Sequence, residues 1–459
     1  MTFFRAILQG CILYNFLIPI ESCVQPPHPT VERGLRINFT EEEPHTVLFK
    51  PPHEPVVWVG AKDKVYIFDF STQPNGTRQE IQIMSRPVPH MPAPKGENFI
   101  TLIHQQPNNR LVCGTNSGQP GCWLVSNDSA SFMGSGRGYA PFTPTDGDLV
   151  LFDEAEVYST INTYPPLIKK SRKFRRIKGE EELYTSDTAM LDPVFLGDIV
   201  YFTQPSYDDK IYTFFQENAV SSNTQTYPTV ARVAQVCRND EGGESSLSAY
   251  KWTTFLKATL LCGDLKLGKV YPKLQDVFFS VEHNNQQAQP VVYGLFLNPW
   301  NFSAICAYSL QDIAKVFRTS KLKKYYGPLP NPRPGVCMPT GKRVPTSTFQ
   351  VADRYPEVSA PVKPSNPSQT PLLESEQQYE KLRVQSLSET GSDIGKLLYL
   401  STPEGKIHKI SVFTANSTSV TLEIQPFLRA AAIQGMLLDI QAQKLYVNSK
   451  WEISEVPLE

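Results

Sequence analysis

The chain has 459 residues, of which 40% are hydrophobic and 19% are charged. This is the composition of a folded protein, and the length allows one large architecture or two to three smaller domains. The net charge of −1 provides no overall field that would attract nucleic acid or an anionic membrane.

The first residues have the pattern of a secretory signal peptide. Arg5 supplies the positive charge, residues 6–20 are mostly apolar, and Pro19 breaks the run. An apolar run of about 15 residues is shorter than the ~20 that a membrane-spanning helix needs. We expect residues 1–22 to be a signal peptide, and residues 23–459 to be a secreted, extracellular domain with no membrane insertion.

Glycosylation sequons agree with secretion. Five sites of the form Asn-x-Ser/Thr have no proline between the two residues: Asn38, Asn75, Asn127, Asn301 and Asn416. Each occupied site must lie on the surface.

Eight cysteines occur, and two of them lie within or next to the signal peptide. The other six are Cys113, Cys122, Cys237, Cys262, Cys306 and Cys337. An even set in an oxidising compartment predicts three disulfides, although the residues alone leave fifteen pairings open. With no Cys-x-x-Cys pair and scattered histidines, we expect no metal and no cofactor.

Short runs of β-branched and aromatic residues, bounded by turn residues, follow one another along the chain and predict strands. They lie at residues 56–59, 65–68, 149–152, 199–202, 211–215, 277–279, 291–296, 397–400 and 444–447. The 39 prolines disfavour long helices. The pattern is all-β, and a length of ~437 residues suits a propeller at about 45–60 residues per blade better than one sandwich.

Two segments differ from this pattern. Residues 307–326 have apolar residues at helical spacing and predict one short helix. Residues 327–372 are rich in Pro, Ser and Asn and predict a long loop or an inserted segment.

Several motifs resemble the semaphorin domain. The most specific are Ala-Arg-Val-Ala-Gln-Val-Cys-Arg-Asn-Asp at 231–240, Lys-Trp-Thr-Thr-Phe-Leu at 251–256 and Asn-Pro-Trp-Asn-Phe-Ser-Ala-Ile-Cys at 298–306. Gly-Gly-Glu-Ser-Ser-Leu-Ser at 242–248 and Thr-Phe-Gln-Val-Ala-Asp-Arg at 348–354 are most similar to class-7 and virus-encoded semaphorins.

The resemblance implies a seven-bladed β-propeller with a short helical insertion, in which an N-terminal strand closes the last blade. It also implies the disulfides Cys113–Cys122, Cys237–Cys337 and Cys262–Cys306. Because the chain ends at Glu459, we expect the semaphorin domain alone, with no cysteine-rich or immunoglobulin module after it.

The same resemblance sets expectations for partners. It implies a plexin receptor, with C-type plexins favoured, and a possible homodimer. Class-7 semaphorins carry an Arg-Gly-Asp tripeptide where this chain has Arg238-Asn239-Asp240, so we do not expect integrin binding there.

The resemblance implies that the receptor contacts lie on edge loops of blades three and four. Tyr184 is the preferred anchor, because a tyrosine buries a large area and keeps a polar tip. The alternative is that Tyr184 packs between blades. Tyr207 is the second choice.

A basic run at 169–178 allows three interpretations. Its cations are Lys169, Lys170, Arg172, Lys173, Arg175, Arg176 and Lys178. They would bind a sulfated glycosaminoglycan, mark protease cleavage after Arg175 or Arg176, or form a solvated loop between blades.

Catalysis has little support, since no G-x-S-x-G, H-E-x-x-H or P-loop is present. Asp208 and Asp209 fit a turn better than a pair of catalytic carboxylates. We therefore expect no enzyme. The resemblance implies a secreted plexin ligand that modulates adhesion, migration and immune-cell signalling, as a viral mimic. A plexin decoy that blocks clustering, or a glycan-binding or glycan-active propeller, is the alternative.

Overall fold

The computed structural model describes the greater part of the chain. The described residues are 30–32, 34–72, 75–126, 128–144, 149–161, 173–202, 208–219, 227–284, 287–387, 395–413 and 418–458. The predicted signal peptide, Asn127, Tyr207, Asn416 and residues 169–172 of the basic run lie outside them.

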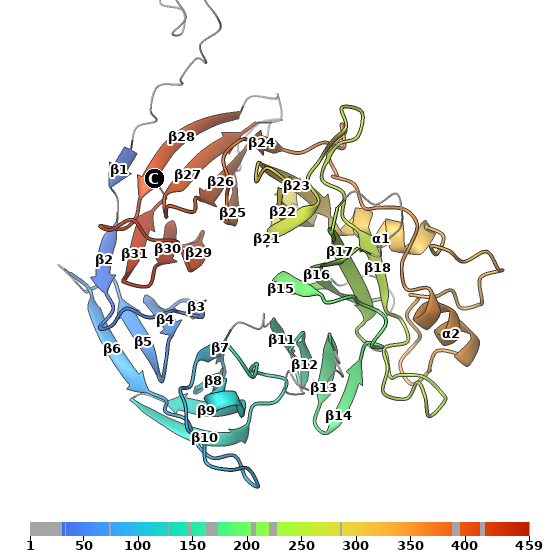
Figure 1. Cartoon of the computed structure of the whole chain (residues 1–459), viewed down its shortest axis with the longest axis horizontal. Helices are drawn as coiled ribbons and strands as arrows, with labels where there is room; N and C mark the ends of the chain where they lie inside the picture. The colour runs from blue at the N-terminus through green and yellow to red at the C-terminus, as the bar shows by residue number, and fades with distance from the viewer. Residues whose placement is uncertain are drawn as a thin grey trace, which may run out of the picture.

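The fold is a ring of seven antiparallel blades (Figure 1). Blade one contains β3 (Val47–Phe49), β4 (Val56–Gly60), β5 (Lys64–Asp69) and β6 (Thr77–Gln82). Blade two contains β7 (Ile100–Gln105), β8 (Arg110–Gly114), β9 (Gly121–Ser126) and β10 (Ser129–Ser135). Blade three contains β11 (Val150–Asp153), β12 (Glu156–Ser159), β13 (Arg175–Lys178) and β14 (Glu181–Tyr184). Blade four contains β15 (Val194–Phe202), β16 (Lys210–Asn218), β17 (Thr229–Cys237) and β18 (Leu256–Thr259). Blade five contains β21 (Lys273–Asn284), β22 (Gln287–Leu297), β23 (Ser303–Ser309) and β24 (Leu373–Ser375). A small hairpin of β19 (Gly263–Asp264) and β20 (Lys269–Val270) lies between blades four and five in sequence. The predicted all-β propeller is confirmed.

An N-terminal strand closes the ring, as the resemblance implies. Blade six contains β25 (Lys381–Ser386), β26 (Lys396–Ser401), β27 (Ile407–Val412) and β28 (Thr418–Gln425). Blade seven takes β29 (Gly435–Asp439), β30 (Lys444–Asn448) and β31 (Glu452–Pro457) from the C-terminal end, and β2 (Leu35–Asn38) pairs antiparallel with β31. β1 (Thr30–Glu32) pairs in parallel with β28 of blade six.

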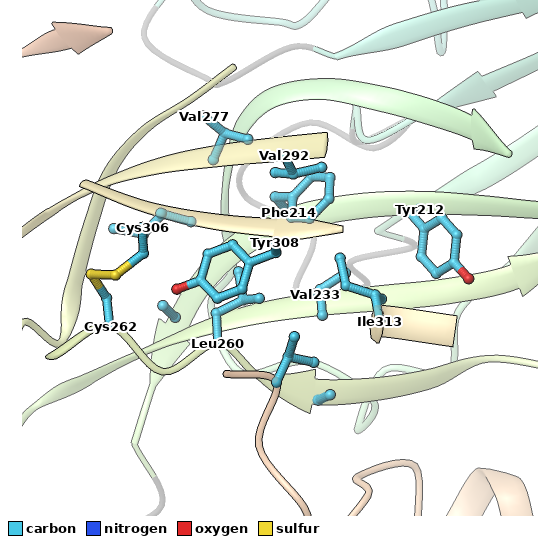
Figure 2. Packing of buried hydrophobic residues seen from close by; sticks show 14 of the residues in the cluster. Tyr212, Phe214, Val233, Leu260, Cys262, Val277, Val292, Cys306, Tyr308 and Ile313 are labelled. Carbon is cyan, nitrogen blue, oxygen red and sulfur yellow. A yellow bond between two sulfur atoms is a disulfide. The ribbon is translucent and has the colours of Figure 1, made fainter. Parts of the chain in front are cut away.

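The core is formed where the faces of neighbouring blades meet. Between blades four and five, Tyr212 and Phe214 of β16 lie with Val292 of β22 and Tyr308 of β23, all almost completely buried (Figure 2). The middle strand β16 is buried on both faces, because blades three and five cover its two sides. This explains why residues 211–215 read as a continuous apolar run rather than an alternating one.

Blade five carries an insertion between β23 and β24, with two helices where the sequence predicts one. Helix α1 (Leu310–Thr319) begins at Ser309, whose side chain caps the helix by accepting from the N–H of Asp312. The predicted helix is therefore present but shorter, because residues 307–309 belong to β23. Helix α2 (Thr346–Arg354) lies within the expected loop and buries Thr348, Phe349 and Ala352. Among the described residues, neither helix has the length or apolar character to cross a bilayer.

The insertion is fastened to blade four. Backbone N–H groups of Val358 and Val362 donate to the carbonyls of Lys257 and Thr259, so residues 356–362 cover the outer edge of β18. The three disulfides are Cys113–Cys122, Cys237–Cys337 and Cys262–Cys306, the same pairs that the resemblance implies.

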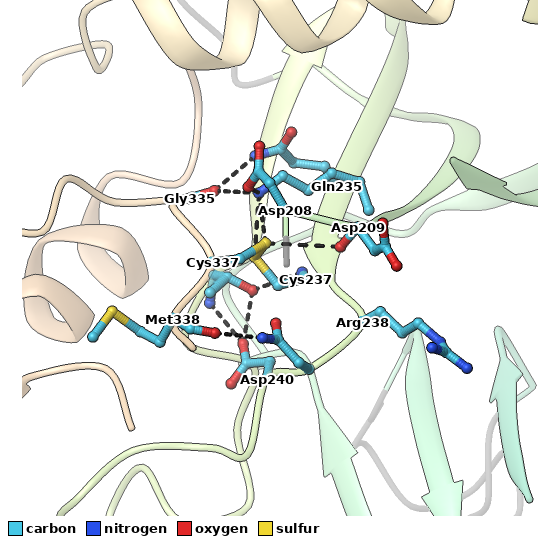
Figure 3. Close-up of a disulfide and its surroundings, with 12 residues drawn as sticks. Asp208, Asp209, Gln235, Cys237, Arg238, Asp240, Gly335, Cys337 and Met338 are labelled. Atoms are coloured by element: carbon cyan, nitrogen blue, oxygen red, sulfur yellow. Dashed lines mark hydrogen bonds and ion pairs between the residues drawn. A yellow bond between two sulfur atoms is a disulfide. The ribbon is translucent and has the colours of Figure 1, made fainter. Parts of the chain in front are cut away.

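The disulfide Cys237–Cys337 joins β17 to the insertion (Figure 3). A buried cation, Lys210, lies beside it. The Lys210 ammonium lies 2.8 Å from Sγ of Cys337 and 3.2 Å from Sγ of Cys237, and it donates to the carbonyl of Gly335 at 2.8 Å. Burial lowers the pKa of this ammonium, and the Asp208 carboxylate at 2.9 Å opposes the shift. Strand β16, β17 and the insertion are thus joined at one point.

Candidate functional site

The loop between β17 and β18, residues 238–255, lies against the outer edge of blade three. The N–H of Tyr184 donates to the carbonyl of Tyr250 at 3.1 Å, and the N–H of Trp252 donates to the carbonyl of Tyr184 at 3.0 Å. The loop thereby continues the sheet beyond β14, and the site joins blades three and four.

Asp240 holds both ends of this loop. Its buried carboxylate accepts hydrogen bonds from the backbone N–H groups of Gly242, Thr253 and Thr254 and from the hydroxyls of Thr253 and Thr254, at 2.7–3.0 Å. Gly242 has φ +74°, and a Cβ there would lie 2.2 Å from the carbonyl oxygen of Ala249. The loop is therefore a fixed structure rather than a mobile connection.

Trp252 anchors the same loop to the core of blade three. Its indole N–H donates to the carbonyl of Phe174 at 3.0 Å, and its ring is stacked with those of Phe174 and Tyr158. The Arg176 guanidinium lies 5.6 Å from the indole ring on the same cluster.

Two apolar side chains project from this fixed loop. Leu247 is 81% exposed and Tyr250 is 63% exposed. Tyr250 borders a hollow of about 670 Å³ with charged walls, which include Glu181, Glu241 and Arg343. Exposed apolar groups on an ordered loop, next to a charged rim, have the layout of a protein-binding surface.

Tyr184 lies at the centre of this arrangement. It is the last residue of β14 and is half-buried, and both its backbone N–H and its carbonyl form hydrogen bonds with the loop. The predicted anchor is thus adjacent to Tyr250, which the sequence analysis did not single out. The signal for Tyr250 was the class-specific Gly-Gly-Glu-Ser-Ser-Leu-Ser motif just before it.

The structure corrects the predicted basic run. Arg175 is fully buried and pairs with Glu182, and Arg176 is 7% exposed and donates to the carbonyl of Arg238. Both lie in β13, which is paired on both sides, so they are available neither to a glycosaminoglycan nor to a protease. Of the other described members, Lys178 is exposed and pairs with Glu156 at 3.0 Å, and Lys173 is half-buried.

The Arg-Asn-Asp tripeptide is used structurally. Arg238 pairs with Asp153 at 2.6 Å, and this hydrogen bond raises the pKa of the guanidinium. Asn239 donates to the carbonyl of Met338, and Asp240 is the buried anchor described above. An integrin would need the aspartate carboxylate exposed, and this one is not.

Other predicted positions are also placed. Asp208 pairs with Lys210, and Asp209 accepts from the Tyr201 hydroxyl at 2.7 Å. The described sequon asparagines Asn38, Asn75 and Asn301 are exposed. No group of three His, Cys, Asp or Glu side chains in the described ranges is arranged to hold a metal ion.

Comparisons with known proteins agree with the fold. The Sema domain family model matches residues 274–440. The complex "Drosophila Plexin A in complex with Semaphorin 1b" aligns with a TM-score of 0.76 and 20% identity, covering 94% of this chain and 88% of the matched chain. "Drosophila Semaphorin 2a" aligns with a TM-score of 0.72 and 19% identity, covering 94% and 76%. At these identities the alignments establish a semaphorin-type propeller.

Sequence relatives are more specific. Human Semaphorin-7A is 48% identical over 427 residues, which is 92% of this chain and 64% of that protein. Semaphorin-like protein A39 of vaccinia virus (strain Copenhagen) is 35% identical over 280 residues, 60% of this chain and 66% of that protein. The chain belongs to the semaphorin family. It spans just under two thirds of the length of these relatives.

Proposed function

We propose that the chain is a secreted ligand of a plexin receptor, with C-type plexins favoured, and that it binds through the loop at 238–255 and Tyr184. The observation that carries this proposal is the fixed loop that presents Leu247 and Tyr250 beside β14. Semaphorin family membership, and a structural neighbour solved in complex with a plexin, support the choice of receptor. Receptor occupancy would modulate adhesion, migration and immune-cell signalling, as a viral mimic of a host semaphorin.

The physical basis is the low entropic cost of presenting these side chains. The Asp240 and Trp252 anchors order the loop before binding, so little conformational entropy is lost on association. Aromatic side chains at the centre of such a surface contribute most of the binding free energy. No chemical step is involved, and binding alone produces the effect.

The test is surface binding of the purified protein to a C-type plexin ectodomain. We expect Tyr184→Ser and Tyr250→Ser each to weaken the affinity at least tenfold, about 1.4 kcal/mol, with secretion and the unfolding midpoint unchanged. Leu428→Ser is the matched control, because Leu428 is 72% exposed and follows blade six, outside this loop.

Two results would contradict the proposal. Equal affinity of the two tyrosine variants and the Leu428 control would remove this surface from the interface. Failure of the folded wild-type protein to bind any plexin would overturn the receptor assignment itself.

A further inference from the structure

The insertion of blade five has a charge that differs sharply from that of the whole chain. Residues 310–344 contain eight Lys and Arg residues and a single carboxylate, Asp312, in a chain with a net charge of −1. Such a concentration in one ordered segment creates a local positive potential.

Seven of these cations are exposed, and four of the exposed ones lie on α1 or just after it without an ion pair to a carboxylate of the described residues. They are Lys315, Arg318, Lys321 and Lys324, and we call them the insertion cations. Lys315 and Arg318 are three residues apart on the helix, on the side away from the buried Ile313 and Phe317. Lys321 precedes the buried Leu322, which bridges to Val358 and fixes the extension.

The neighbouring carboxylates are engaged elsewhere. Asp312 accepts from the Ser309 hydroxyl at 2.9 Å, and Glu357 pairs with Lys323 and Arg232, both at 2.7 Å. Within the described ranges, none of the insertion cations forms an ion pair with a carboxylate. Their charge is therefore available to an external anion.

A small hollow at the C-terminal end of α1 adds to this charge. It has a volume of about 230 Å³, and Arg318 and Arg333 both line it, with Lys210 and Asp208 as a neutral pair at its wall. Arg333 donates through one terminal nitrogen to the carbonyls of Phe317, at 3.3 Å, and Ser320, while its buried Nε has no hydrogen-bond acceptor among the described residues. Burial lowers the pKa of Arg333, as expected for a guanidinium without a paired carboxylate.

Stabilisation of the helix does not account for these residues. A cation in the last turn of a helix interacts favourably with the helix dipole, by about 0.3–1 kcal/mol, and this suits Arg318. The effect falls off within one turn, so it explains neither Lys321 nor Lys324 beyond the helix end.

We propose that the insertion cations bind a sulfated glycosaminoglycan, with one sulfate group of the polymer in the hollow between Arg318 and Arg333. A linear polymer with regularly spaced sulfates matches cations that are spread along a helix and its extension, and guanidinium groups bind sulfate oxygens through paired hydrogen bonds. The hollow is concave and has room for a single anionic group. This site is separate from the loop at 238–255, so the inference does not depend on plexin binding.

The experiment measures binding of the purified protein to immobilised heparin at 0.15 M salt. The variant Lys315→Gln/Arg318→Gln/Lys321→Gln should bind at least tenfold more weakly and elute at lower salt. The control Lys95→Gln/Lys266→Gln/Lys450→Gln removes the same charge from exposed sites elsewhere and should bind as the wild type. The unfolding midpoint of all three proteins, measured in parallel, should be the same and shows that they are folded.

Three comparisons test the specificity: hyaluronan, anionic phospholipid vesicles, which should also bind more weakly than heparin, and a variant of the basic run. Hyaluronan, which carries carboxylates but no sulfates, should bind at least tenfold more weakly than heparin. A variant with Lys169, Lys170, Arg172 and Lys173 changed to Gln should retain heparin binding. The proposal is wrong if the wild type does not bind heparin, or if hyaluronan or anionic phospholipid vesicles bind as well as heparin. It is also wrong if the insertion variant binds heparin as its control does, or if only the variant at Lys169, Lys170, Arg172 and Lys173 loses binding.

Discussion

At the scale of single residues, His45 is an example of a buried group whose protonation state is set by its surroundings. It lies in the segment that joins β2 to β3, with its ring stacked on Phe39 at 3.6 Å. Its Nδ1 faces the carbonyl of Ser449 at 3.0 Å and Oε1 of Gln434 at 3.2 Å, so it carries the proton as a donor. Nε2 is buried with no partner among the described residues, and burial lowers the pKa of His45 to about 4.

The lowered pKa of His45 predicts that acid destabilises the folded protein. Between pH 6.5 and pH 4 the unfolded chain protonates His45 and the folded chain does not, so the free energy of unfolding falls as the pH is lowered. The His45 contribution should be roughly 3 kcal/mol between pH 7 and pH 4. Chemical denaturation of the wild type and of His45→Asn, whose amide can replace the Nδ1 donor, measures it as the difference between their pH profiles. Parallel profiles would contradict the prediction.

At the scale of elements, the Cys237–Cys337 disulfide joins the insertion to β17 across 100 residues of sequence. In the chain-entropy model, a loop of this length contributes about 4–5 kcal/mol. Cys237→Ala/Cys337→Ala should therefore lower the free energy of unfolding by about that amount, and it removes two contacts of the buried Lys210. Limited proteolysis should then cut the insertion first, at its Lys and Arg residues.

The matched control is the short disulfide Cys113–Cys122, which joins residues 9 apart on the paired strands β8 and β9. Its removal should cost between about 2 and 3 kcal/mol in the same model and leave the insertion resistant to protease. Equal loss of stability and cleavage at the same sites in both double variants would show that neither loop length nor attachment of the insertion determines the effect.

The elements that the sequence predicted well are those whose local pattern agrees with their surroundings. Strands such as β16 and β22 are middle strands covered on both faces, so their apolar runs are visible without any knowledge of partners. Helix α2 was missed because its nine residues are flanked by prolines and it packs against residues far away in sequence, such as Lys251 and Ser186. Arg175 and Arg176 were misplaced for the same reason, since their partners Glu182 and Arg238 become neighbours only when the blade is formed.

At the scale of the whole molecule, the ring depends on one pairing between the two ends of the chain. β2 supplies the fourth strand of blade seven, with Leu35 opposite Glu455 and Ile37 opposite Ile453. β1 makes a different contact, in parallel on β28 of blade six, and it adds to an edge without closing anything. The two N-terminal strands should therefore differ in their importance for stability.

Two nested deletions test this difference directly. Removing residues 30–32 takes away β1 alone, and we expect the monomer yield and the unfolding midpoint to change little. Removing residues 30–38 also takes away β2, and the lost ladder hydrogen bonds and partly buried Leu35 and Ile37 are on the order of 5 kcal/mol. This loss is comparable with the net stability of a folded protein. The deletion also leaves β31 as an open sheet edge. The longer deletion should therefore yield mainly aggregate in size-exclusion chromatography, and a monomer of normal stability would show that the ring closes without β2.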